Sequence, residues 1–127
     1  MGYYQRNAGW YRKHFALPAS WEGSSVWLYF EGIFHATTSY LNGQKVGFHK
    51  QGYTDFWLRL DDVPGLKFGG GENVLALYAD ASTGTGWWYE GGGLTRHNWL
   101  VRASPAHIAQ DGAWVFTNQT SGGGATF

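Results

Sequence analysis

The sequence predicts an all-β fold, a jelly-roll β-sandwich formed by one domain. Three observations support this: strand-like runs recur about every ten residues, helical patterns are nearly absent, and aromatic residues and glycine are unusually frequent. The chain has 127 residues, among them 8 Trp, 8 Tyr, 8 Phe and 20 Gly. Rings at this density can fill a thin sandwich core, and exposed rings can stack on the apolar faces of sugars.

The expected strands follow one another along most of the chain. A loosely alternating run, Tyr11 to Leu17, ends at Pro18, and the dense apolar run Val26 to Phe30 fits a strand that is buried on both faces. Asn42-Gly43 lies between two strand-like runs and predicts a tight hairpin, because both residues accept a positive φ. The other expected strands are 37–41, 45–49, 55–60, 73–79 and 94–101, with weaker candidates at 106–108 and 113–117.

The composition of the chain bears on which partners and which cellular location are expected. Lys plus Arg and Asp plus Glu both total 9, so nothing electrostatic favours nucleic acid or an anionic membrane as a partner. Cysteine is absent, and no stretch approaches the roughly 20 apolar residues of a membrane-spanning helix. The first fifteen residues lack the apolar region of a signal peptide. A bacterial cytoplasmic and a secreted location both stay open.

Three stretches carry a family resemblance through their order and composition. The first is Gly9-Trp-Tyr-Arg-Lys13, the second joins Phe30-Glu-Gly-Ile33 to Tyr40-Leu-Asn-Gly43, and the third is Gly86-Trp-Trp-Tyr-Glu-Gly-Gly-Gly-Leu94. Together they resemble the N-terminal sugar-binding domain of family 2 glycoside hydrolases, the β-galactosidase and β-glucuronidase group. The resemblance implies a galactose-binding-domain-like jelly roll.

The resemblance also implies a division of the chain. Residues 1–108 correspond to the jelly-roll sugar-binding domain. Residues 109–127 form a C-terminal tail, similar to the start of the immunoglobulin-like domain that follows in the family; its glycine-rich end is expected to be partly flexible. In the family, both catalytic glutamates lie in a third domain, a TIM barrel. We therefore expect no catalytic residue in this chain, which would be a fragment or a stand-alone descendant of such an enzyme.

A candidate sugar site lies in the third stretch. The side chains of Trp87, Trp88 and Tyr89 cannot all face the core, because successive strand residues point to opposite faces. Glu90 follows directly, and three glycines after it leave the rings unhindered on one side. A ring could stack on a sugar while Glu90 accepts hydrogen bonds from its hydroxyl groups.

A structural interpretation of the same stretch stays open. One tryptophan would then fill the sandwich core, and Glu90 would pair with Arg96 or Arg102. By resemblance, the stretch lies near the active-site mouth of the family's enzymes, which favours contact with a ligand. The sequence alone does not decide between these two interpretations.

Asp80 and His49 are further candidates for the sugar site. The resemblance implies a sugar-contacting carboxylate just before the aromatic residues, but Thr85 and Gly86 occupy those positions. Asp80 is the nearest acid upstream and could compensate from its loop, and His49 could add polarity to the rim of the site.

The five histidines lack a metal-ligand spacing, so no metal site and no cofactor is expected. A structural calcium ion, as some jelly-roll modules hold, could use Asp61-Asp62.

Three functions are compatible with the sequence. A non-catalytic carbohydrate-binding domain, which is the favoured hypothesis, would bind a galactoside, a glucuronide or a plant polysaccharide through exposed rings. A small stand-alone glycoside hydrolase would need a pair of carboxylates about 5–9.5 Å apart, and no such pair is recognisable. A structural or interface domain would expose apolar surface that neighbouring domains normally cover, and it could form a homo-oligomer.

Overall fold

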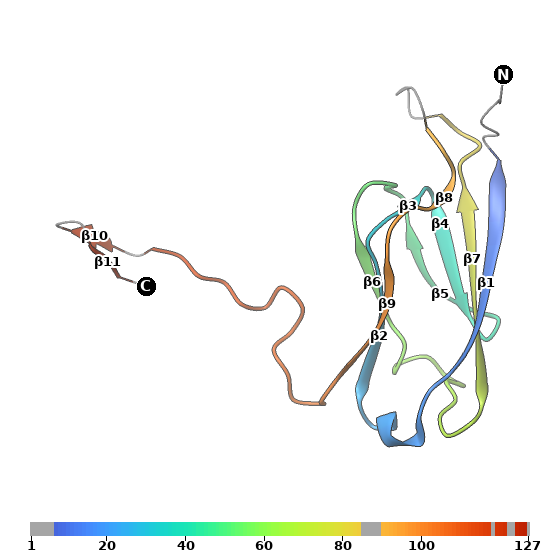
Figure 1. Ribbon diagram of the computed structural model, residues 1–127, viewed down its shortest axis with the longest axis horizontal. Coiled ribbons are helices and arrows are strands. Elements are labelled where there is room, and N and C mark those ends of the chain that lie inside the picture. Colours follow the sequence, from blue (N-terminus) through green and yellow to red (C-terminus); the bar gives the residue numbers. More distant parts are fainter. Residues whose placement is uncertain (1–6, 85–89, 118, 122–123, 127) are drawn as a thin grey trace.

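The computed structural model describes residues 7–84, 90–117, 119–121 and 124–126, and its main body is a β-sandwich, as the sequence predicts (Figure 1). All the strand pairs between its named strands are antiparallel. One short 3-10 helix, η1 (Ala19–Trp21), follows the first strand. The strands are β1 (Ala8–Ala16), β2 (Ser25–Phe30), β3 (Ile33–Phe34), β4 (Thr37–Leu41), β5 (Gln44–His49), β6 (Phe56–Arg59), β7 (Glu72–Asp80), β8 (Gly93–Leu94), β9 (Asn98–Ala103), β10 (Gln119–Ser121) and β11 (Gly124–Thr126).

Two sheets face each other across the core. One has four strands in the order β1-β7-β4-β5, and the other has three in the order β6-β2-β9. Strands β3 and β8 form a short ladder of their own, and β10 pairs with β11. After β9 the chain leads away from the sandwich toward the β10–β11 hairpin (Figure 1). No helix in the described part of the chain is long and apolar enough to cross a membrane.

The core follows the two-residue period of the strands. Alternate residues of β7 are buried, and the residues between them face outward. In β2, Val26, Leu28 and Phe30 are buried, whereas Trp27 and Tyr29 are half-buried on the outer face. The expectation that this strand is buried on both faces is therefore wrong. Aromatic neighbours cover its outer face only in part, as where Tyr29 stacks on Trp57 at 4.3 Å between ring centroids.

The predicted hairpin forms at Asn42-Gly43, where φ is 49° and 84°, and it joins β4 to β5. The expected strand over 94–101 is divided into β8 and β9, because the intervening residues instead bond to the segment after β2, with the Thr95 N–H donating to Gly32 O. The weaker candidates at 106–108 and 113–117 are wrong: both stretches are exposed and have no strand partner.

Candidate functional site

Several predicted site residues lie at one end of the sandwich, the end at which β4 begins and β5 and β7 finish. We call it the upper end (Figure 1). Thr37, the first residue of β4, pairs with His49 on one side and with Ala79 on the other. Asp80 is the next residue along β7. The register of three strands thus brings His49 and Asp80 to the same end.

His49 and Asp80 do not share one face. His49 pairs with the buried Thr37, and its ring stacks on Phe56 of the opposite sheet at 4.3 Å between centroids. Its Nε2 lies 3.0 Å from the hydroxyl group of Thr54. Asp80 follows the buried Ala79, so its side chain points to the opposite side of the sheet. His49 therefore lies at the same end as Asp80 but on the opposite face of the sheet.

His35 is a residue at this end that the sequence analysis missed. It lies in the connection between β3 and β4. Its side chain is 7% exposed, and its carbonyl group accepts the Asp80 N–H at 2.9 Å. Its Nε2 lies 3.5 Å from the hydroxyl group of Thr83, and its Nδ1 has no hydrogen-bond partner in the described part of the chain. A buried, incompletely bonded imidazole is uncommon and could serve a ligand or a water molecule.

The backbone beside His35 is held in an unusual conformation. Ala36 has φ 45°, in the left-handed region that residues with a Cβ atom rarely adopt. Its N–H donates to the carbonyl group of Lys50 at 3.1 Å, which ties the β3–β4 connection to the residue that follows β5. The connection is thus fixed between the ends of β5 and β7. Its composition carries no turn signal, so the sequence offered no means of finding it.

The segment before β8 also lies at the upper end, where it packs against the residue after β7. A Cβ atom on Gly92 would lie 2.9 Å from Cβ of Ala81, 3.6 Å from the Asn7 carbonyl oxygen and 3.9 Å from that of Phe34. Gly93 has φ 113°, and a Cβ atom there would meet the hydroxyl group of Tyr11. These two glycines therefore allow close packing. A Cβ atom on Gly91 would have none of the described residues within 4 Å.

Glu90 is buried, with 3% of its surface exposed. Burial of a carboxyl group requires polar partners, so this residue has a structural role whatever else it does. Arg102, one of the partners considered for it, instead donates to the Ser24 hydroxyl at 3.0 Å and to the Ser20 carbonyl, at the start of β2. The candidates Trp87, Trp88 and Tyr89 lie outside the described residues, so their role stays a prediction.

An exposed ring also lies at the upper end, on the loop between β5 and β6. Tyr53 is 66% exposed, and its ring centroid lies 5.3 Å from that of Phe34. Phe34 in turn contacts the ring of His35 at 4.5 Å. Gly52 makes this packing possible, since a Cβ atom there would overlap the Phe34 ring. The sequence analysis did not single out Tyr53, because an isolated tyrosine in a loop has no distinguishing pattern.

Three carboxyl groups, those of Asp80, Glu31 and Asp61, have pKa values that are shifted toward the ionised form. The pKa of Asp80 is lowered by hydrogen bonds from the Ser82 hydroxyl and N–H groups. The pKa of Glu31 is lowered chiefly by the Trp99 indole N–H, which donates to it at 3.0 Å. Burial alone would raise the pKa of Asp61, but hydrogen bonds from Arg59 and from the Val26 N–H lower it. Such groups are acceptors of hydrogen bonds at neutral pH, not proton donors.

Asp61 and Asp62, the two residues that could bind calcium, both form ion pairs with Arg59. Arg59 contacts Asp61 at 2.9 Å and Asp62 at 3.2 Å. The described ranges contain no group of three or more His, Asp and Glu residues that could hold a metal ion. A calcium ion would have to displace Arg59, and a calcium site here stays a prediction.

Comparison with known proteins relates this chain to one family. The family model described as "Glycosyl hydrolases family 2, sugar binding domain" matches residues 4–80. A β-galactosidase of Thermoanaerobacter pseudethanolicus is 35% identical, and the match covers 81% of this chain and 15% of the relative. A β-galactosidase of Bacteroides ovatus is 33% identical over 87% of this chain and 13% of its own length. The chain thus spans only about a seventh of these relatives.

Solved structures give the same relationship. A glycosyl hydrolase family 2 member from Bacteroides cellulosilyticus superposes with a TM-score of 0.80 at 34% identity, covering 89% of this chain and 15% of that protein. A β-glucuronidase of glycoside hydrolase family 2 also gives 0.80, at 28% identity and 92% coverage of this chain and 14% of that protein. Both the sequence and the arrangement of strands therefore match a small part of larger proteins.

Proposed function

The chain belongs to the sugar-binding domain family of the family 2 glycosyl hydrolases, and on this premise we propose that it is a non-catalytic carbohydrate-binding domain. One observation carries the proposal: the end of β7, the β3–β4 connection and the segment before β8 meet at the upper end. Their meeting brings the ionised Asp80 and His35, whose Nδ1 has no partner among the described residues, to the end where Gly92, two residues after Glu90, packs against Ala81. In the sequence, Trp87, Trp88 and Tyr89 come directly before Glu90.

The proposed recognition combines stacking and hydrogen bonding. A pyranose ring presents apolar C–H groups on its faces and hydroxyl groups at its edge, so it suits an aromatic ring beside fixed acceptors. The aromatic residues 87–89 would supply the stacking surface, Asp80 would accept hydroxyl hydrogen bonds, and His49 would border the site. Tyr53 adds an exposed ring at the same end.

The identity of the relatives suggests the class of glycan. They are β-galactosidases and β-glucuronidases, so the proposed ligand is a galactoside, a glucuronide or a plant polysaccharide that contains such units. In a longer protein the domain would act beside a catalytic domain. Catalysis by this chain itself has little support, because hydrolysis requires a carboxylic acid that donates a proton. The lowered pKa values of Glu31 and Asp80 favour the opposite state.

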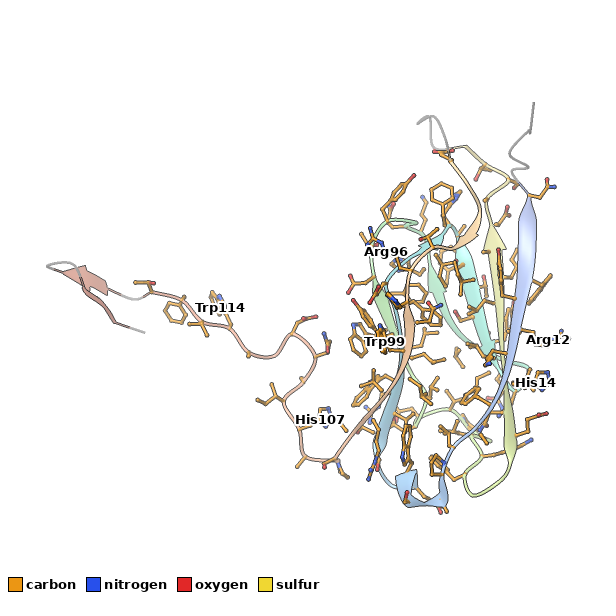
Figure 2. The ribbon with its side chains drawn as sticks, in the orientation of Figure 1. Arg12, His14, Arg96, Trp99, His107 and Trp114 are labelled. Atoms are coloured by element: carbon orange, nitrogen blue, oxygen red, sulfur yellow. The ribbon has the colours of Figure 1, made fainter. Side chains whose placement is uncertain are left out.

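Titration of the purified chain with a panel of galactosides, glucuronides and plant polysaccharides tests this function. Trp87→Ala and Trp88→Ala should each weaken binding about tenfold, because stacking of a ring is lost. Trp114→Ala is the matched control: Trp114 lies on the segment that leads away from the sandwich (Figure 2) and should not affect binding. A folded chain that binds no glycan of the panel would refute the proposal, as would equal binding by all three variants.

A second candidate function, that of an interface domain, is favoured by an apolar groove between the sheets. The groove has a volume of about 570 Å³ and lies between β1 and β9, which are edge strands of their sheets. An open sheet edge beside uncovered apolar side chains is a typical site for another strand or subunit. We propose that a second copy of the chain covers it. The groove is lined by Tyr11, Arg12, Lys13, Phe15, Leu28, Phe30, Leu75, Leu77, Leu94, Asn98 and Leu100.

A further inference from the structure

The outer face of the four-stranded sheet has a shallow hollow whose lining residues are different from those proposed for the upper end. It lies over β1, β7 and β4 and is lined by Trp10, Arg12, His14, Tyr40, Gly43, Val74 and Ala76. Three of these residues alternate along β1, so their side chains lie in one row on one face. Figure 2 shows two of them, Arg12 and His14, on the side of β1 that faces away from the three-stranded sheet. The row is therefore accessible along its whole length.

Trp10 forms an ordered aromatic surface in this row. Its ring packs against Tyr78 at 5.0 Å and against Tyr40 at 5.7 Å between centroids, and both neighbours are half-buried. Trp10 itself is 61% exposed. Two rings thus hold the indole in place while one side of it stays open. An exposed tryptophan on the outer face of a sheet contributes little to the core, but it suits stacking against the C–H face of a sugar.

A free cation lies next to this ring. Arg12 is exposed and, within the described residues, forms no hydrogen bond or ion pair. His14, the next residue in the row, differs in this respect because its Nδ1 lies 2.9 Å from Glu72 Oε2. Residues two apart on a strand are separated by about 7 Å. If a sugar ring stacks on Trp10, the carboxylate of that ring or the next sugar of the same glycan chain therefore lies near the guanidinium group of Arg12.

We propose that this hollow is a second carbohydrate site and that it binds a glycan containing hexuronic acid. Trp10 would stack on one pyranose ring, and Arg12 would hold the carboxylate through paired hydrogen bonds, for which the planar guanidinium group is suited. Because the carboxylate of Glu72 lies at the His14 end of the row, the acid group of the ligand belongs at the Arg12 end. The site uses other residues than the upper end and does not depend on the function proposed there.

Nuclear magnetic resonance titration of the ¹⁵N-labelled chain distinguishes the two sites. The probes are a galacturonic acid tetrasaccharide and its neutral counterpart, a galactose tetrasaccharide, at up to roughly millimolar concentration. The acidic probe should shift the backbone amides of residues 9–14, 38–40 and 74–78. Trp10→Ala should weaken its binding about tenfold, because the stacking surface is lost. Arg12→Gln should weaken binding of the acidic probe about tenfold and leave any binding of the neutral probe unchanged.

Phe48→Ala serves as the control, since Phe48 is an exposed ring on β5 outside the hollow, and binding should be unaffected. Circular dichroism and thermal unfolding verify that each variant is folded, and Arg12→Gln removes only an exposed side chain. Shifts confined to residues 49–54 and 80–93 would overturn this inference and leave the function of the upper end standing. Equal affinity of Arg12→Gln and the wild type for the acidic probe would also overturn it, as would the absence of any shift.

Discussion

The side-chain amides of Asn42 and Asn73 are joined by a hydrogen bond of 3.0 Å, from Nδ2 of Asn42 to Oδ1 of Asn73. Asn42 also accepts the Val74 N–H at 2.8 Å and donates to the Gly65 carbonyl group. Asn73 is fully buried and exchanges two hydrogen bonds with the backbone of Lys67, at 3.0 and 2.8 Å. The β4–β5 hairpin is thereby fastened to the loop before β7, at the end of the sandwich opposite to the proposed sugar site.

Asn73→Ala should lower the free energy of unfolding by about 2–4 kcal/mol, because the N–H and carbonyl groups of Lys67 lose their partners inside the protein. Urea denaturation with an unchanged m-value measures this loss. Asn98→Ala, at an exposed position of β9, is the matched control and should change stability by less than about 0.5 kcal/mol. Equal stability of the two variants would show that the buried amide is dispensable.

Gly52→Ala should destabilise the upper end by about 1–3 kcal/mol. The added Cβ atom would overlap Cδ2 and lie 2.9 Å from Cγ of the buried Phe34 ring, which must then move. Gly9→Ala is the comparison, since its Cβ atom would meet only ordinary contacts of 3.6 Å and longer. Thermal unfolding measures both variants. If Gly52→Ala melts at the wild-type temperature, the ring of Phe34 is not fixed as described.

The ion pair of Asp61 and Arg59 should make stability depend on pH at the acidic end. The pKa of Asp61 in the folded state is lowered from 3.8. The stabilisation by the ion pair is therefore present above the unfolded pKa and is lost as the pH falls through the folded value. Asp61→Asn keeps an acceptor for the Val26 N–H but removes the charge. The half-exposed Arg59 limits the effect to about 0.2–1 kcal/mol by solvent screening. Urea denaturation of both proteins should give a constant difference above about pH 5 that becomes smaller as the pH falls below the unfolded value of 3.8; a pH-independent difference would contradict it.

The apolar groove between β1 and β9 should lead to self-association of the isolated chain. Leu100, which lines it, is 37% exposed, and Leu100→Lys should shift the chain toward the monomer in sedimentation velocity experiments. Ile108→Lys is the matched control, because Ile108 is exposed on the segment after β9 and lies outside the groove. A wild-type chain that stays monomeric over a wide concentration range would count against the interface function.

Local sequence patterns were sufficient to predict most strands, but they were not sufficient to predict which residues come together at the candidate site. The apolar run that forms β2 and the Asn42-Gly43 hairpin are properties of neighbouring residues, and the strand and the hairpin are both present in the structure, although β2 is not buried on both faces. The break between β8 and β9 was missed, because it arises from hydrogen bonds to the segment after β2, which is more than sixty residues away. The segment 113–117 has the composition of a strand but finds no partner strand. Pairing, not composition, decided these cases.

The sequence by itself determined the fold class and the family, because both depend on spacing and order along the chain. Only the tertiary structure decided which side chains share a surface. Thr37 pairs with both β5 and β7, and this long-range register brings His49 and Asp80 to one end and buries His35 there. The presence of an aromatic residue in the sequence does not show whether its ring fills the core or faces solvent. That Trp10 is exposed beside Arg12 follows from the face that β1 presents outward.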